Sequence, residues 1–181
     1  MAMALTIPHY TRDDLARFPG DGQRYELLDG ILLVTPAPGE DHQVVATRLA
    51  IALGSRLPPE IQVTAPGVVL HGTATQLQPD VLVYRGEGPI RQHWREPRAL
   101  WLAIEVLSPS SRIYDREFKR DAYLALGVIE VWLVDLEERA VYVSRGDGTR
   151  EERHAGRLTW LGPGLHEPVS LDLGQVFAGL E

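Results

Sequence analysis

Short blocks of apolar and polar residues divide the chain, and some of these blocks have the spacing of helices. In the longest of them, "DHQVVATRLAIALGSRL", apolar side chains fall on one face at intervals of three and four residues, and Pro58 stops the pattern. Near the N-terminus, Thr11 is a helix cap ahead of "RDDLARF". The pattern predicts four helical segments, at residues 11–19, 41–57, around Lys119 as far as Gly127, and at 175–180.

Other blocks are short and rich in valine, leucine and isoleucine, which is typical of strands. Asp29-Gly30 joins two of them and predicts a tight hairpin turn. The longest, "ALWLAIEVLSP", is apolar on both faces, so we expect it to be covered on both sides. The predicted strand regions are residues 25–36, 61–64, 67–72, 79–84, 99–109 and 129–145, the last turning at 136–139. Strands interrupted by helices favour an α/β fold with a sheet of mixed direction.

The length of 181 residues, with 44% apolar and 24% charged residues, fits one domain spanning 1–181. Within it, residues 1–20 are expected to form an N-terminal arm and helix, and 147–181 an edge hairpin and tail. No apolar run approaches the roughly 18–20 residues of a membrane helix, and the N-terminus lacks the features of a signal peptide. We therefore expect a cytoplasmic protein with no membrane partner. The absence of cysteine excludes disulfides and thiolate metal sites.

A net charge of −7 argues against non-specific binding to nucleic acid through a basic surface. A nucleic-acid partner would require something else to offset its phosphates. Clustered carboxylates that hold a divalent cation can do so, because the ion becomes the largest local positive charge.

Two acidic residues stand where a charge is unexpected. Glu105 is the only charge in the long apolar strand, and Asp80 stands at the entrance to a run of valine and leucine. Carboxylates near the ends of neighbouring core strands are tolerated if they share a metal, and oxygen ligands suit Mg²⁺ or Mn²⁺. For either acid alone, the alternative is a strand-end carboxylate bonded to a loop or an arginine.

Lys119 is the only lysine in the chain, and all other residues with a permanent positive charge are arginines. Lysine differs from arginine in being a compact point charge that can lie beside a phosphate or an attacking water. A solvated helix position, with Asp115 and Lys119 forming an i,i+4 ion pair, is the competing interpretation.

The blocks "QPDVLVY", "LAIEVLSPSS" and "YDREFKRDAYLALGVIEVWLVD", preceded by "RYELLDGILLVTPAPGEDHQ", resemble the Uma-type family of restriction endonuclease-like proteins, a branch of the PD-(D/E)XK nuclease superfamily. The resemblance runs from about Tyr25 to Val143. It implies the restriction-endonuclease-like fold, with a central mixed sheet flanked by helices. It also implies Mg²⁺-dependent hydrolysis of phosphodiester bonds in DNA, with Mn²⁺ as a substitute metal.

In this resemblance, Asp80 and Glu105 match the two acids of the superfamily. Its lysine normally comes two residues after the second acid, where this chain has Leu107, and Lys119 on the following helix takes its place. We expect Asp80, Glu105 and the carbonyl of Val106 to hold one metal ion, with Lys119 acting on the attacking water. Removing the charge of Asp80 is then expected to leave stability unchanged or raise it, because two buried like charges would be separated.

The N-terminal part departs from the family pattern. The family's Gly-Glu after the hairpin aspartate is Gly30-Ile31 here, and its Glu-His at the start of the long helix is Asp41-His42. Glu26 and His42 are therefore expected as outer-shell or substrate contacts. For His42 the alternative is a capping or packing role.

Substrate contacts are also expected in the loop 85–98, where Arg91 and Arg95 suit phosphates, although a solvated surface loop would look the same. A homodimer is favoured because cleavage of a duplex needs two active sites. Two other functions stay open: a catalytically silent binding or regulatory module with the nuclease fold, and a metal-dependent hydrolase acting on RNA or another phosphoester.

Overall fold

The computed structural model describes residues 8–86, 99–108 and 115–180. Its largest element is a six-stranded sheet. The strands follow one another across this sheet in the order β10 (Glu152–His154), β9 (Ala140–Arg145), β8 (Glu130–Asp135), β7 (Ala99–Leu107), β6 (Val81–Arg85) and β3 (Ile61–Thr64). β7 and β8 are parallel, and the other neighbours are antiparallel. The sheet is therefore mixed, as the sequence predicts.

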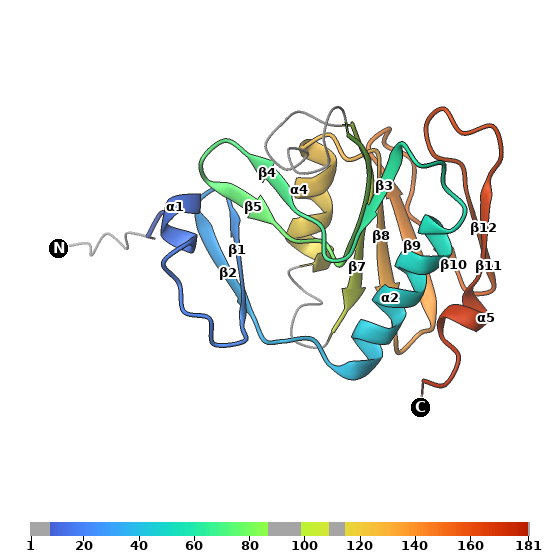
Figure 1. Ribbon diagram of the computed structural model, residues 1–181, viewed down its shortest axis with the longest axis horizontal. Helices are drawn as coiled ribbons and strands as arrows, with labels where there is room; N and C mark the ends of the chain where they lie inside the picture. The colour runs from blue at the N-terminus through green and yellow to red at the C-terminus, as the bar shows by residue number, and fades with distance from the viewer. Residues whose placement is uncertain (1–7, 87–98, 109–114, 181) are drawn as a thin grey trace.

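A second sheet has four strands and stands beside the first (Figure 1). Its order is β2 (Ile31–Thr35), β1 (Arg24–Leu28), β5 (Thr75–Leu77) and β4 (Val69–His71). β1 and β2 form the predicted hairpin, and Asp29 and Gly30 at its turn have φ of 49° and 80°. Both residues have a left-handed backbone conformation, which a tight two-residue hairpin turn requires. β5 was not predicted, because three residues with one apolar side chain give no strand pattern.

Two apolar clusters cover the two faces of the six-stranded sheet. Leu102, Ile104 and Val106 of β7 join a cluster with helix α2 (Glu40–Gly54) and the C-terminal segments. On the opposite face, Ala103 and Leu107 pack in a cluster that includes Tyr123 and side chains of the four-stranded sheet. β7 is thus buried on both faces, as its sequence indicates.

The helices lie close to their predicted positions. Thr11 caps α1 (Arg12–Leu15) through a capping box, although this helix ends four residues before Pro19. The segment around Lys119 begins as a π-helical turn, η2 (Asp115–Lys119), and continues as α4 (Arg120–Ala125). No helix of the described residues is long and apolar enough to cross a membrane.

The C-terminal part differs from the predicted edge hairpin. β10 alone extends the six-stranded sheet, by pairing with β9. β11 (Arg157–Trp160) and β12 (Val169–Asp172) instead form a separate two-stranded sheet, and α5 (Leu173–Val176) follows directly. Leu158, Trp160 and Leu171 are buried in the same cluster as α2. The hairpin therefore closes the core over one face of the large sheet rather than lengthening its edge.

Candidate active site

Asp80 immediately precedes β6, and Glu105 lies on the neighbouring strand β7. In the antiparallel pairing of β6 with β7, Val81 is opposite Ile104. One step further along this register lies Asp80 opposite Glu105. Residues directly opposite in an antiparallel pair point to the same face, with Cβ atoms about 4.5–5.5 Å apart. The sheet therefore brings the two acids together on the side where α4 lies.

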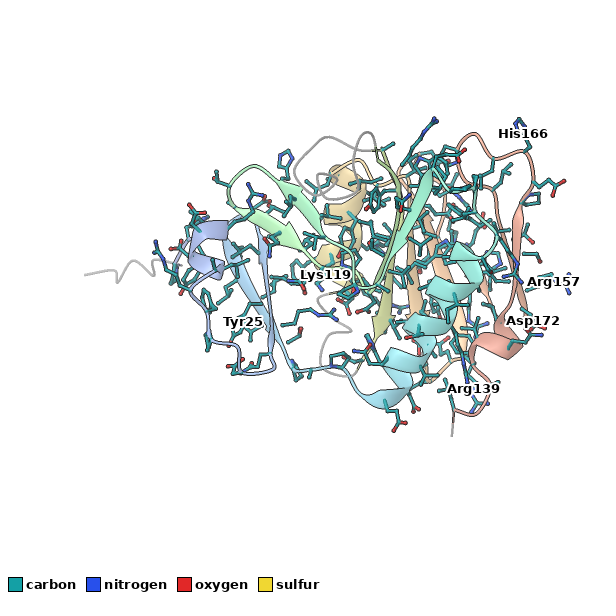
Figure 2. The ribbon with its side chains drawn as sticks, in the orientation of Figure 1. Tyr25, Lys119, Arg139, Arg157, His166 and Asp172 are labelled. Atoms are coloured by element: carbon teal, nitrogen blue, oxygen red, sulfur yellow. The ribbon has the colours of Figure 1, made fainter. Side chains whose placement is uncertain are left out.

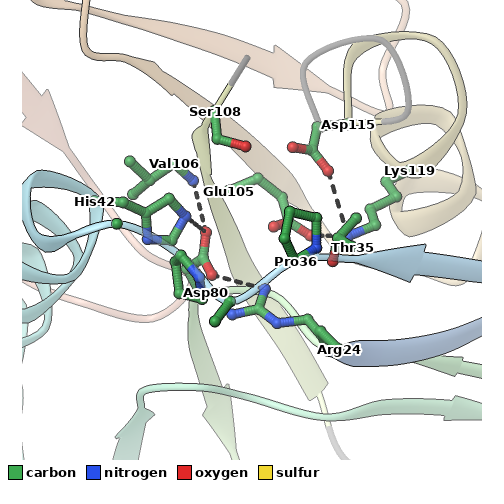
Figure 3. Close-up of a pocket in the computed structure, with 13 residues that line it drawn as sticks. Arg24, Thr35, Pro36, His42, Asp80, Glu105, Val106, Ser108, Asp115 and Lys119 are labelled. Carbon is green, nitrogen blue, oxygen red and sulfur yellow. Dashed lines mark hydrogen bonds and ion pairs between the residues drawn. The ribbon is translucent and has the colours of Figure 1, made fainter. Parts of the chain in front are cut away.

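Asp80 is 4% exposed and receives hydrogen bonds on both oxygens. Arg24 lies 2.9 Å from Oδ1, while His42 Nε2 lies 3.0 Å and the backbone N–H of Val106 2.9 Å from Oδ2 (Figure 3). Burial alone would raise the pKa of Asp80, but the bonds and charges of His42 and Arg24 and the bond from Val106 outweigh it and hold this pKa below its ordinary value. Asp80 is therefore a well-compensated carboxylate.

Lys119 is 2% exposed and lies among three carboxylates. Its ammonium is 2.6 Å from Glu26 Oε2, 3.3 Å from Asp115 Oδ1 and 3.4 Å from Glu105 Oε1. Burial alone would lower the pKa of Lys119, but the charges of Glu105, Glu26 and Asp115 overcome it and raise this pKa. The ammonium donates hydrogen bonds to Glu26 and Glu105 and forms an ion pair with Asp115. The solvated surface position considered for Lys119 is therefore wrong.

Glu105 is in a different environment from Asp80, although both are buried. Tyr123 donates a hydrogen bond of 2.6 Å to Glu105 Oε1, the oxygen that faces Lys119. Burial raises the pKa of Glu105 well above its ordinary value; Lys119 opposes this rise, while the charges of Asp115, Asp80 and Glu26 add to it. Negative charge at Glu105 is thus only partly offset by the protein itself.

These side chains surround a cavity of about 220 Å³ (Figure 3). Residues 35–39, which lead from β2 into α2, form one side of it. The other sides are formed by Arg24, His42, Asp80, Glu105, Val106, Ser108, Asp115 and Lys119. Acidic and basic side chains from β1, α2, β7 and η2, and from the residue before β6, thus line one small volume.

The residues of this cavity fit a divalent cation. Asp80, Glu105 and Asp115 are buried carboxylates in its wall, and Glu26 is a fourth buried carboxylate, which contacts Lys119 but does not line the cavity. Among the described residues, two permanent cations, Lys119 and Arg24, contact these acids, so the carboxylates outnumber the cations. No three histidine, aspartate or glutamate side chains of the described residues are arranged around a common metal position. Coordination would therefore include backbone oxygen and water, which is usual for Mg²⁺.

Every predicted site residue that falls in the described part of the chain lies at this cluster. Glu26 accepts bonds from Lys119 and from the backbone N–H of Gln78, and His42 lies on the buried face of α2. His42 contacts Asp80, so it does more than cap or pack the helix. Arg91 and Arg95 lie outside the described residues.

Three residues that contact the predicted site residues were not themselves predicted as site residues. The sequence already paired Asp115 with Lys119 at i,i+4, without making it a site residue, and this ion pair is present. Tyr123 stands four positions after Lys119 and could have been found from the same spacing. Arg24 stands two residues before Glu26 on β1 and could have been found from strand alternation in the same way.

Two acids on adjacent strands and a lysine on the next helix, carried by a mixed sheet, define a restriction-endonuclease-like fold. The family model described as "Uma2: Putative restriction endonuclease" matches residues 12–180. The chain belongs to this family, whose name implies a nucleic-acid substrate.

A solved structure shares the fold. The crystal structure of a "putative nuclease belonging to DUF820" from Anabaena variabilis ATCC 29413 superposes with a TM-score of 0.71 at 20% sequence identity. The match covers 93% of this chain and 97% of the other. Among curated proteins, none matches the chain.

Proposed function

We propose that the protein is a metal-dependent endonuclease that hydrolyses phosphodiester bonds in DNA. The observation that carries the proposal is the arrangement of Asp80, Glu105 and Lys119, three buried charged groups from two adjacent strands and the following helix, in the wall of one cavity. A structural role alone gives little reason to bury this many charges together, because each one costs free energy to remove from water.

Asp80, Glu105 and the carbonyl oxygen of Val106 are the groups that would hold Mg²⁺ or Mn²⁺. When bound, such an ion polarises the scissile phosphate and lowers the pKa of a water molecule. The protein's own groups do the rest. Lys119 orients the attacking water and stabilises the negative charge that grows on the phosphate oxygens as one P–O ester bond breaks.

The neighbouring residues position these groups. Glu26 and Asp115 hold the Lys119 ammonium from two sides, and Tyr123 fixes one oxygen of Glu105. His42 and Arg24 orient Asp80 in the same way. In this assignment, Glu26, His42 and Tyr123 act through the groups that they contact.

A plasmid-nicking assay tests the proposal. Wild-type protein should convert supercoiled DNA to open circles in Mg²⁺ or Mn²⁺ and lose this activity with EDTA. Asp80→Asn and Glu105→Gln should each lower the rate at least about 100-fold, since each removes one charged ligand. Asp147→Asn, a change of the same kind at an exposed loop residue, is the matched control and should keep the wild-type rate.

The other two functions give different results in the same assay. A catalytically silent module would bind nucleic acid without nicking it in any metal. A hydrolase for RNA or a small phosphoester would leave the plasmid intact but cleave its own substrate with the same dependence on Asp80. The predicted homodimer is tested separately, by light scattering of the purified protein.

A further inference from the structure

A second cavity, of about 360 Å³, lies directly beyond Arg24. It is bounded by α1 and the loop that follows, by the beginning of β1, and by residues 76 and 78 at β5. Tyr25, which lines it, lies in the N-terminal part of the molecule in Figure 2, at the other end of the view from the C-terminal hairpin. The volume falls in the range of about 300–1,000 Å³ that small-molecule sites occupy.

The lining of this second cavity is unusual for a protein with a net charge of −7. Arg12 and Arg24 line it, and no carboxylate does. The Nε of Arg12 is buried and has no hydrogen-bond partner among the described residues. Because this atom is buried, an anionic ligand in the cavity would meet the terminal nitrogens of the Arg12 guanidinium, whose planar fork suits a phosphate. The charge of this wall therefore suits a phosphate-bearing molecule.

Aromatic and amide side chains also line this second cavity. The rings of Phe18 and Tyr25 have centroids 4.9 Å apart. Gln23, Gln76 and Gln78 add three amides, of which that of Gln76 makes no hydrogen bond within the described part of the chain. Aromatic faces stack on nucleobases, and glutamine amides both donate to and accept from base edges. The combination matches a base with its phosphate better than a phosphate alone.

Arg24 connects the two cavities. Its guanidinium nitrogen NH1 lies 2.9 Å from Oδ1 of Asp80, in the wall of the first cavity, and 3.4 Å from the carbonyl oxygen of Gln78, in the wall of the second. One arginine side chain thus separates the proposed cleavage site from the aromatic cavity. Because the two cavities share Arg24, a strand whose phosphate lies at the first cavity would have to extend only past this side chain to enter the second.

We propose that this second cavity is a subsite for one nucleobase of the substrate strand, next to the scissile phosphate. Phe18 provides the stacking face, Gln76 contacts the base edge, and Arg12 binds the adjacent phosphate. The inference rests on the proposed function, because it takes the nucleic-acid strand as given. It adds the position at which one base is bound and the side chains that contact this base.

The test measures binding of a short fluorescein-labelled single strand by anisotropy, in Ca²⁺, with strand integrity checked on a gel. A series of strands each lacks one base. Wild-type protein should lose affinity by roughly 5- to 160-fold when one particular base is absent, which is the contribution of one stacked base. Phe18→Leu keeps an apolar side chain and should bind the intact strand as weakly as wild-type protein binds the strand that lacks this base. Removal of the same base should cause no further loss of affinity in this variant.

Two arginine variants separate the base from the phosphate. Arg12→Gln should weaken binding of every strand in the series by the same factor, with a shallower salt dependence. Arg157→Gln makes the same charge change at an exposed residue of β11, on the opposite side of the molecule from Tyr25 (Figure 2), and should bind as wild type. If Phe18→Leu fails to fold by circular dichroism, Gln76→Met replaces it and should reduce the penalty for the same missing base.

The outcomes distinguish the subsite from the cleavage reaction. The subsite is wrong if every strand that lacks one base binds with the same affinity, even if plasmid is nicked. It is also wrong if Phe18→Leu and Gln76→Met lose affinity at the same missing base, and by the same factor, as wild-type protein. A position-specific profile without nicking in any metal supports the subsite and overturns the proposed reaction. If no single strand or duplex binds at all, the subsite is wrong.

Discussion

Replacing Lys119 tests how the charges of the site are balanced. Lys119→Met keeps the length of the side chain and removes its charge. Three carboxylates, Glu26, Glu105 and Asp115, then lose the cation that lies 2.6–3.4 Å from them. Removing one partner of a buried ion pair costs about 3–5 kcal/mol, because the remaining charge is left uncompensated.

The size of the effect can be stated as a shift in melting temperature. For a protein of about 150–250 residues, 1 kcal/mol changes Tm by roughly 2–4 °C. Lys119→Met should therefore melt about 6–20 °C below wild type. Lys119→Arg keeps the charge but forces a larger planar group into a closed space, at about 1–3 kcal/mol, and should melt roughly 2–12 °C lower.

Urea unfolding followed by circular dichroism and by tryptophan fluorescence gives the free energies. Arg153→Gln is the control, since it removes a cation from an exposed ion pair with Glu138 and should cost about 1 kcal/mol or less. Glu26→Gln in the Lys119→Met background should recover part of the loss, because one unpaired carboxylate is neutralised. A Lys119→Met protein within about 1 kcal/mol of wild type would refute the buried three-carboxylate arrangement.

The remaining predictions concern the two acids and the position from which the lysine has moved. Asp80→Asn should lower the free energy of unfolding by about 1–3 kcal/mol, because this carboxylate accepts three hydrogen bonds that stabilise its charge. This is contrary to the expectation from sequence. Equal or higher stability in urea unfolding would contradict the three hydrogen bonds. Glu105→Gln should be as stable as wild type or more so in the same measurement, since burial, together with three nearby carboxylates, raises the pKa of Glu105. A loss larger than that of Asp80→Asn would show that the charge is compensated after all. In calorimetry, Asp80→Asn should abolish binding of Mn²⁺, and unchanged affinity would remove Asp80 from the ligands. Leu107→Lys combined with Lys119→Ala should nick plasmid faster than Lys119→Ala alone, because position 107 shares the strand face of Glu105; Leu107 is 3% exposed, so equal rates count against the idea only if circular dichroism shows a folded double variant.

The sequence by itself determined much of the architecture. The period of apolar residues located α2 and β7, and Asp29-Gly30 located the hairpin turn, because these features depend on neighbours along the chain. It also singled out Asp80 and Glu105, since a charge in an apolar strand is visible without any structure.

The tertiary structure decided which of these residues meet. β5 exists because β1 and β4 pair with it on both sides, and three residues carry too little pattern to show this in sequence. Arg24 reaches Asp80 across 56 positions of the chain, and Lys119 reaches Glu26 across 93. The sequence singled out Lys119 as the only lysine but left a solvated helix position open as the alternative, and only the packing of η2 and α4 against the two sheets decides that it is buried. Burial and long-range pairing depend on the whole fold, so no local pattern encodes them.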